Sequence, residues 1–145
     1  MNWQNFAVDR LRDYRARALA VETIPDRIRL LELEFQGIRA ASTDRVPSRS
    51  GASRRDDALV SNIAAREELK RNYAIARRET ALTRKGLDAL SEQERRVLEG
   101  FYVDRQRGHV ERLCEELCVE KSKIYQIKDD ALRKFTMACY AVVEI

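Results

Sequence analysis

The sequence predicts an all-α protein with an N-terminal helical hairpin or coiled-coil part and a C-terminal helix-turn-helix. Charged residues make up 36% of the 145 residues, whereas Gly and Pro together fill only seven positions. Apolar residues recur at spacings of three and four in several segments, which is the period of amphipathic helices. Hydrophobic residues form 44% of the chain, which is enough to bury a core.

The N-terminal part, residues 1–89, is expected to form helices that pair or oligomerise. Apolar residues in 3–21 recur at helical spacing between Arg and Asp, which predicts an amphipathic helix. A second helix is predicted over 25–41, because Pro25 suits a first helical turn. A long helix over 57–88 could pack on the second helix as an antiparallel hairpin, or on a second chain. Both alternatives fit the sequence.

Residues 42–57 are rich in Ser, Arg, Gly and Pro and are predicted to be a flexible linker. Pro47 and Gly51 are expected to break any helix in this stretch. The sequence favours solvated arginines on a surface loop over a loop that contacts phosphate or a partner. The arginines concerned are Arg45, Arg49, Arg54 and Arg55.

The C-terminal part, residues 90–145, is predicted to be a separate domain that opens with a capped helix. Ser91 can accept a bond from the free backbone amides, and Glu94 can reach back to Ser91, as in a capping box. A short helix over 109–117 follows, then a tight turn at Cys118-Val119. A last helix begins near Glu120 and runs past residue 135. Two short helices joined by a tight turn form the helix-turn-helix pattern.

The last helix has one apolar and one polar face. At 100° per residue, one face holds Ile124, Ile127, Ala131 and Phe135. The opposite face, with the residues that flank its start, holds Lys121, Ser122, Lys123, Tyr125, Gln126, Asp129 and Arg133. In a helix-turn-helix the start of the second helix enters the major groove, where Gln, Ser and Lys can bond base edges. A solvated helix face without function fits the spacing equally well.

Residues 90–135 resemble region 4 of bacterial sigma factors. The segments concerned are LSEQERRVLEGFY and HVERLCEELCVEKSKIYQIKDDALRKF, about a third of the chain. The positions that match the family pattern are Glu94, Arg95, Val97, Leu98, Tyr102, Leu113, Leu117, Val119, Ile124, Gln126, Ile127, Ala131, Leu132 and Lys134. The resemblance implies sequence-specific binding of double-stranded DNA and a role in regulating transcription.

The resemblance also implies which residues contact DNA. They are Lys121, Ser122, Lys123, Tyr125 and Gln126, to which we add Lys128 and Arg133 on the same helix. Ser122 stands where the family usually has Glu and Tyr125 where it usually has Arg, so the DNA sequence read should differ from the standard promoter element. Cys118 stands at a turn position that usually holds Gly. It must therefore adopt an unusual backbone angle, or the turn must differ.

The rest of the chain differs from a true sigma factor, because residues 1–89 contain no recognisable promoter-melting segment. The layout resembles small phage and prophage regulators with sigma-like C-termini, such as late-gene activators of the ArpU and RinA type. A homodimer is expected, because two copies can read half-sites about one helical turn apart. RNA polymerase is a candidate second partner.

Two competing functions fit the same sequence. The small subunit of a phage DNA-packaging terminase also joins a helix-turn-helix to helical oligomerisation elements. A protein-binding module could instead dock on RNA polymerase and never read bases. An enzyme is the least favoured class, because the sequence holds no phosphate-cradling Gly-rich loop and no convincing Ser/His/Asp or Cys/His set.

No cofactor or metal is expected. Cys114 and Cys118 are four residues apart, but no second ligand pair is nearby, and structural zinc needs four ligands. Three cysteines without a recognisable secretory leader predict a reducing bacterial cytoplasm. No run of about 18 apolar residues predicts a membrane span.

Charge is unevenly distributed along the chain. The net charge is +4, yet residues 91–145 carry ten Lys or Arg against eleven Asp or Glu. Because affinity for phosphate depends on local Lys and Arg, this balance argues against tight DNA binding by that segment alone.

Overall fold

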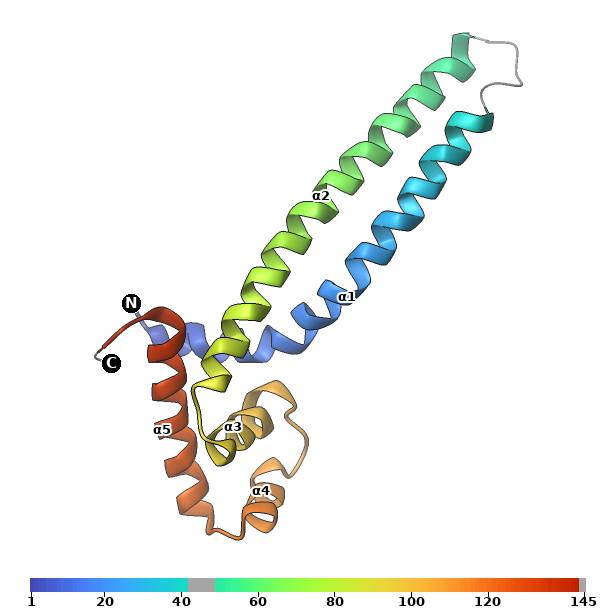
Figure 1. Cartoon of the computed structure of the whole chain (residues 1–145). Coiled ribbons are helices and arrows are strands. Elements are labelled where there is room, and N and C mark those ends of the chain that lie inside the picture. Colours follow the sequence, from blue (N-terminus) through green and yellow to red (C-terminus); the bar gives the residue numbers. More distant parts are fainter. Residues whose placement is uncertain (42–48, 144–145) are drawn as a thin grey trace. The chain divides into compact units, whose positions relative to one another are not determined.

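The computed structural model describes residues 1–41 and 49–143, with only the backbone given for 49–53. The elements are α1 (Trp3–Ala41), α2 (Arg49–Asp88), α3 (Glu92–Leu98), the π-helical turn η1 (Glu99–Val103), α4 (His109–Leu117) and α5 (Lys121–Tyr140) (Figure 1). No strand occurs among the described residues. The prediction of an all-α fold is confirmed.

The helices group into two compact units. Unit 1 consists of Met1–Ala18 and the described part of Arg78–Ile145, and unit 2 consists of Leu19–Arg77. This grouping differs from the sequence-based division into 1–89 and 90–145. The reason is a long-range core: Ala7 and Leu11 of α1 belong to one buried cluster with residues from α2, α3 and α5.

The predicted break between 3–21 and 25–41 is wrong, because α1 runs without interruption from Trp3 to Ala41 with Pro25 inside it. Proline lacks the N–H that would bond the carbonyl four residues earlier, at a cost of roughly 3 kcal/mol in a helix interior. No Gly or Asn lies between Val21 and Pro25 to end the helix in a left-handed turn. The packing of α1 along α2 on both sides of Pro25 offsets this cost, so the helix continues through the proline.

The predicted linker 42–57 is wrong over its second half, because α2 begins at Arg49 and includes Gly51. Within this segment Arg54 is exposed and Arg55 is half-buried. Residues 42–48, which include Arg45 and Pro47, lie outside the described residues. The helix predicted over 57–88 is confirmed and is longer at its start than expected.

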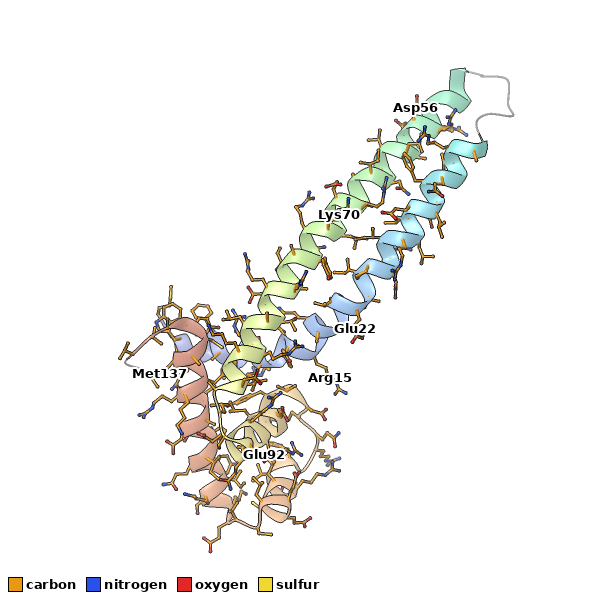
Figure 2. All side chains as sticks on the ribbon, viewed as in Figure 1. Arg15, Glu22, Asp56, Lys70, Glu92 and Met137 are labelled. Atoms are coloured by element: carbon orange, nitrogen blue, oxygen red, sulfur yellow. The ribbon has the colours of Figure 1, made fainter. Side chains whose placement is uncertain are left out.

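Unit 2 is an antiparallel hairpin formed by the later part of α1 and the first part of α2 (Figures 1 and 2). The row on α1 that is buried or half-buried comprises Ile24, Ile28, Leu31, Phe35 and Ile38. The matching row on α2 comprises Leu59, Asn62, Arg66, Leu69, Tyr73 and Ala76. Both rows alternate spacings of three and four, as in a coiled coil. Of the two packing alternatives for the long helix, the structure shows packing within the chain.

A polar layer crosses the middle of the hairpin. Asn62 is 7% exposed, and its Nδ2 donates to the backbone oxygen of Leu31 at 2.8 Å. The Asn62 Oδ1 accepts from Arg66 Nε at 2.9 Å, and the Arg66 guanidinium lies 4.9 Å from the centre of the Phe35 ring.

One apolar residue of the predicted 57–88 helix departs from its expected place on the buried stripe. The expected stripe comprises Leu59, Ile63, Leu69, Tyr73, Ala76 and Leu82. Ile63 is instead 44% exposed, because Asn62 occupies this layer.

Unit 1 holds two adjoining apolar clusters. The first comprises Ala7, Leu11, Leu87, Leu98, Ala131, Leu132, Phe135 and Cys139. The second comprises Val97, Phe101, Val110, Leu113, Ile124 and Ile127. Gly86 allows α2 and α5 to approach closely, since a Cβ there would lie 2.5 Å from the Sγ of Cys139.

Hydrogen bonds cap the start of α3, and a ring contact and a hydrogen bond hold the end of α5 against α1. The capping box predicted at Ser91 is present: Glu94 N–H donates to Ser91 Oγ at 3.2 Å and Ser91 N–H to Glu94 Oε1 at 3.1 Å. At the end of α5, the Tyr140 ring lies 5.2 Å from that of Trp3, and Arg10 Nε donates to the Tyr140 hydroxyl at 3.2 Å. None of the described helices is long and apolar enough to cross a membrane.

Candidate nucleic-acid interface

The turn between α4 and α5 has the unusual backbone angle that the sequence required. Cys118 ends α4 with φ 55° and ψ 46°, in the left-handed region that favours glycine. Its N–H bonds the Cys114 carbonyl, to which Val119 N–H also donates at 3.2 Å. Glu120 then returns to extended backbone, and α5 starts at Lys121. The chain thus passes from one helix to the next in three residues.

The apolar face of α5 anchors the helix as its spacing predicted. Ile124, Ala131 and Phe135 are fully buried and Ile127 is 7% exposed. Ile124 and Ile127 pack in the cluster that contains Val97 of α3 and Leu113 of α4. Because these contacts fix the rotation of α5, they also fix which side chains face outward.

The outward side chains at the start of α5 are the predicted DNA contacts. The exposed ones are Lys121, Ser122, Lys123, Tyr125, Gln126 and Arg133. The first turn of α5 contains no acidic residue, and Glu120 makes no side-chain bond to the backbone amides there. Two lysines and uncapped amides at the positive end of a helix dipole favour an anion at this position.

Lys128 differs from the other predicted contacts, because it is half-buried. Its Nζ lies 2.8 Å from Asp129 Oδ1 and 5.8 Å from the ring centres of both Phe101 and Tyr125. Burial lowers the pKa of Lys128, but the hydrogen bond to Asp129 and electrostatic interactions with nearby Tyr102 and Asp129 outweigh it, so the pKa is raised. The charge is therefore kept, and part of it is already neutralised by Asp129.

A row of rings connects the start of α4 with the exposed face of α5. The Phe101 ring lies 4.9 Å from the His109 ring and 5.8 Å from the Tyr125 ring, with both pairs edge to face. Phe101 is 8% exposed and Tyr125 is 40% exposed, so a buried ring supports an exposed one. This support restricts where Tyr125 can point.

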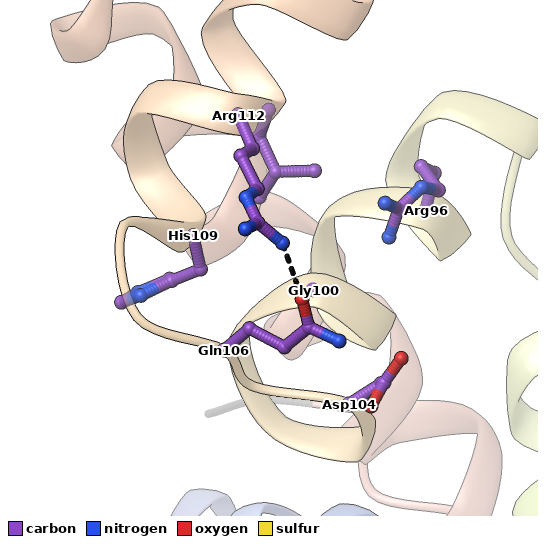
Figure 3. Close-up of a pocket in the computed structure, with 7 residues that line it drawn as sticks. Arg96, Gly100, Asp104, Gln106, His109 and Arg112 are labelled. Carbon is purple, nitrogen blue, oxygen red and sulfur yellow. Dashed lines mark hydrogen bonds between the residues drawn. The ribbon is translucent and has the colours of Figure 1, made fainter.

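A small open pocket of about 110 Å³ lies beside the start of α4. It is lined by Arg96, Gly100, Asp104, Gln106, His109, Arg112 and Leu113 (Figure 3). Arg112 donates to the Gln106 side chain across it (Figure 3). Arg96 and Asp104 are engaged elsewhere, with Glu116 at 2.9 Å and Arg15 at 2.8 Å respectively. Two of its charged side chains are therefore already paired with residues outside the pocket.

Sequence reasoning did not select Arg105 and Arg107, which are exposed in the short segment that precedes α4. His109, the first residue of α4, contacts the Phe101 ring, which in turn contacts Tyr125 on α5. The two arginines therefore add positive charge near the start of α4. These arginines could have been found from the sequence, because they directly precede the helix predicted over 109–117.

The three cysteines are free thiols in different surroundings. Cys139 is buried, and burial raises the pKa of its thiol to about 11, whereas Cys118 is exposed. Cys114 is half-buried on α4. Within 1–41 and 49–143 no group of three His, Cys, Asp or Glu side chains is arranged to hold a metal ion.

Comparison with known proteins gives no relative. No family model, no curated protein sequence and no solved structure matches this chain.

Proposed function

We propose that this protein is a sequence-specific double-stranded DNA-binding regulator of transcription that reads DNA with the start of α5. The observation that carries the proposal is the alternation on α5. Ile124 and Ile127 are buried, while Ser122, Lys123 and Gln126 are exposed on the other side. A helix whose apolar face packs in the core and whose polar face is exposed can enter a major groove.

The exposed residue types suit base reading. Gln can bond adenine through two atoms, Ser can bond several base edges, and Lys can bond guanine or phosphate. Lys121 and Lys123 supply local positive charge in a region whose total charge is slightly negative. Because non-specific affinity comes mainly from phosphate contacts, we expect it to be modest and specific contacts to matter more.

The α4–turn–α5 arrangement also supports the resemblance to sigma-factor region 4, since a positive-φ residue occupies the turn where that family has Gly. By this resemblance we propose a phage or prophage regulator that acts as a homodimer in the bacterial cytoplasm. RNA polymerase is the proposed second partner. Binding, rather than catalysis, is the proposed activity.

Selection of bound duplexes from a random pool tests the proposal. The full wild-type chain should enrich a defined DNA motif. A Lys121→Ala/Lys123→Ala variant should retain far less DNA than the wild type does. A matched control is Lys70→Ala/Arg71→Ala on the exposed side of α2 in unit 2, which removes two charges and should leave the motif unchanged.

Other outcomes of that selection would favour the competing functions. Enrichment of no motif, with retained capture of RNA polymerase, would favour a docking module. A ring of eight or more subunits on DNA would favour a terminase small subunit.

A further inference from the structure

The α1 helix carries a second row of residues in unit 2, on the side turned away from α2. Leu19, Leu30 and Leu33 are 61%, 53% and 63% exposed. Together with exposed Thr23, Asp26 and Gly37 they are spaced 4-3-4-3-4, which is the spacing of the two core positions of a coiled-coil heptad. At 100° per residue, this row lies about 140° around the helix from the row that faces α2.

This second row distinguishes α1 from an ordinary helix of a two-helix hairpin. Such a helix is apolar toward its partner and polar on the opposite side. On the outward side of α2, Val60, Ile63 and Ile75 are also exposed. However, Glu67 and Lys70, which pair at 3.3 Å, occupy the heptad positions that follow Val60 and Ile63, and Ile75 lies outside that row. The apolar row on α1 is therefore the better candidate for burial by another helix.

Charges along the row indicate what covers it. Arg27 and Glu34 lie on one flank, seven residues apart, and both are exposed. If a second α1 packs antiparallel with Leu30 opposite the partner's Leu33, Arg27 of each chain lies beside the partner's Glu34. Because the two chains are related by a twofold axis, this opposite-charge contact occurs twice, and the surface is therefore complementary to itself.

We infer that the row Leu19, Thr23, Asp26, Leu30, Leu33 and Gly37, here called the outer α1 row, is an antiparallel dimer seam that binds a second copy of this chain. The inference rests on the homodimer proposed above and names its surface. In this register Asp26, which pairs with Arg29 in the same chain, lies opposite the partner's Gly37, which leaves room for both side chains. A parallel pairing would instead place two Asp26 carboxylates against each other in the seam, which is costly.

Light scattering of the full chain without DNA, at micromolar concentration, tests the seam. The wild type and a Val60→Glu/Ile63→Glu variant should be dimers, whereas Leu30→Glu/Leu33→Glu should be a monomer with an unchanged circular dichroism spectrum. Both variants place two carboxylates on exposed apolar positions at the middle of the hairpin, so they are matched. Retained dimer in the Leu30→Glu/Leu33→Glu variant would overturn the seam and leave the homodimer standing.

The oligomeric state of the wild type in the same light-scattering experiment tests the homodimer itself. A monomeric wild type would overturn both the dimer and its seam. The reading of DNA by α5 is tested separately by selection, so it would stand or fall on that result.

A charge exchange tests the antiparallel direction. Arg27→Glu or Glu34→Arg alone should raise the dimer dissociation constant about tenfold, because two attractive contacts become repulsive. The double variant Arg27→Glu/Glu34→Arg should recover the wild-type constant. In a parallel dimer Arg27 would face the partner's Glu22 and Glu34 the partner's Arg29, so the double variant would be weaker than either single one. That result would overturn the antiparallel seam.

Discussion

Individual side chains at the start of α5 alternate between solvent and core within a single turn. Lys123 is exposed, Ile124 is fully buried, Gln126 is exposed and Ile127 is 7% exposed. Apolar spacing alone predicted which residues are buried here, because an amphipathic helix has one rotation that hides all of its apolar residues. The role of each exposed side chain rests on chemistry and on the resemblance, since exposure permits contact with DNA without identifying it.

Lys123→Ala should weaken binding to every DNA sequence by a similar factor, because a lysine at this position is expected to contact phosphate. Loss of one phosphate contact should reduce the slope of log affinity against log salt by about one unit. Fluorescence anisotropy over a salt series measures this slope. An unchanged slope would remove Lys123 from the interface.

Cys118→Gly should stabilise the protein by about 0.5 to 1 kcal/mol. Cys118 has φ 55°, which costs a non-glycine residue roughly 1 to 2 kcal/mol, whereas glycine adopts this angle freely but loses part of the gain because its unfolded chain is more flexible. Urea unfolding measures the difference. Cys118→Ser is the control with the same backbone restriction, and it should not gain stability. A loss of stability in Cys118→Gly would contradict the account of the turn.

Among the elements, the sequence predicted most reliably those with strong local signals. The capping box at Ser91 and the buried face of α5 follow from residues three or four apart, so local reasoning finds them. Pro25 and Gly51 were misread for the same reason. Each is unfavourable in a helix by itself, but the packing of α1 along α2 in unit 2 outweighs the cost of Pro25, and Gly51 costs a helix only about 1 kcal/mol. A pattern read within one segment of the sequence cannot report the stabilisation that comes from packing against another segment.

Gly86→Ala should destabilise the protein by about 1 to 2 kcal/mol, although alanine normally favours helix. The new Cβ would lie 2.7 Å from a Phe135 ring carbon as well as 2.5 Å from the Cys139 Sγ, so the core must shift. Gly37→Ala in the Leu30→Glu/Leu33→Glu background, which removes the proposed seam, is the matched control, because nothing in the chain lies within 4 Å of a Cβ there. It should stabilise the helix by about 0.5 to 1 kcal/mol. Equal effects of both changes in urea unfolding would refute the close approach of α2 and α5.

The capping box of α3 should make stability depend on pH. The hydrogen bond from Lys134, at 2.8 Å, and those with Ser91 lower the pKa of Glu94 below 4.5, although burial opposes them. Since the folded pKa is the lower one, the stabilisation is complete above pH 4.5 and is lost as the pH falls through the folded value.

Glu94→Gln isolates this charge, because Gln can still form the capping bond. At pH 7 the variant should be less stable by about 0.5 kcal/mol, the usual size of a partly exposed ion pair. The difference should shrink below pH 4.5 in unfolding measured over a pH series. A difference that stays constant down to pH 3 would show that the ion pair contributes nothing.

For the whole molecule, the fold class was predictable and the grouping of helices was not. Composition and helical spacing are properties of the sequence itself, so they give an all-α fold. The grouping depends on Ala7 and Leu11 meeting Leu98 and Phe135 about ninety or more residues later, and no local pattern reports such contacts. The exposure of the predicted DNA contacts other than Lys128 was predictable, because they lie on one continuous helix with a clear apolar face.

The DNA-reading role of α5 is tested most directly by the affinity of Gln126→Ala for a selected duplex and for a scrambled one. Loss of a two-atom base contact should weaken binding to the selected duplex by about 1 to 3 kcal/mol and leave the scrambled duplex nearly unaffected. Equal losses on both duplexes, or none on either, would show that the exposed face of α5 does not read bases.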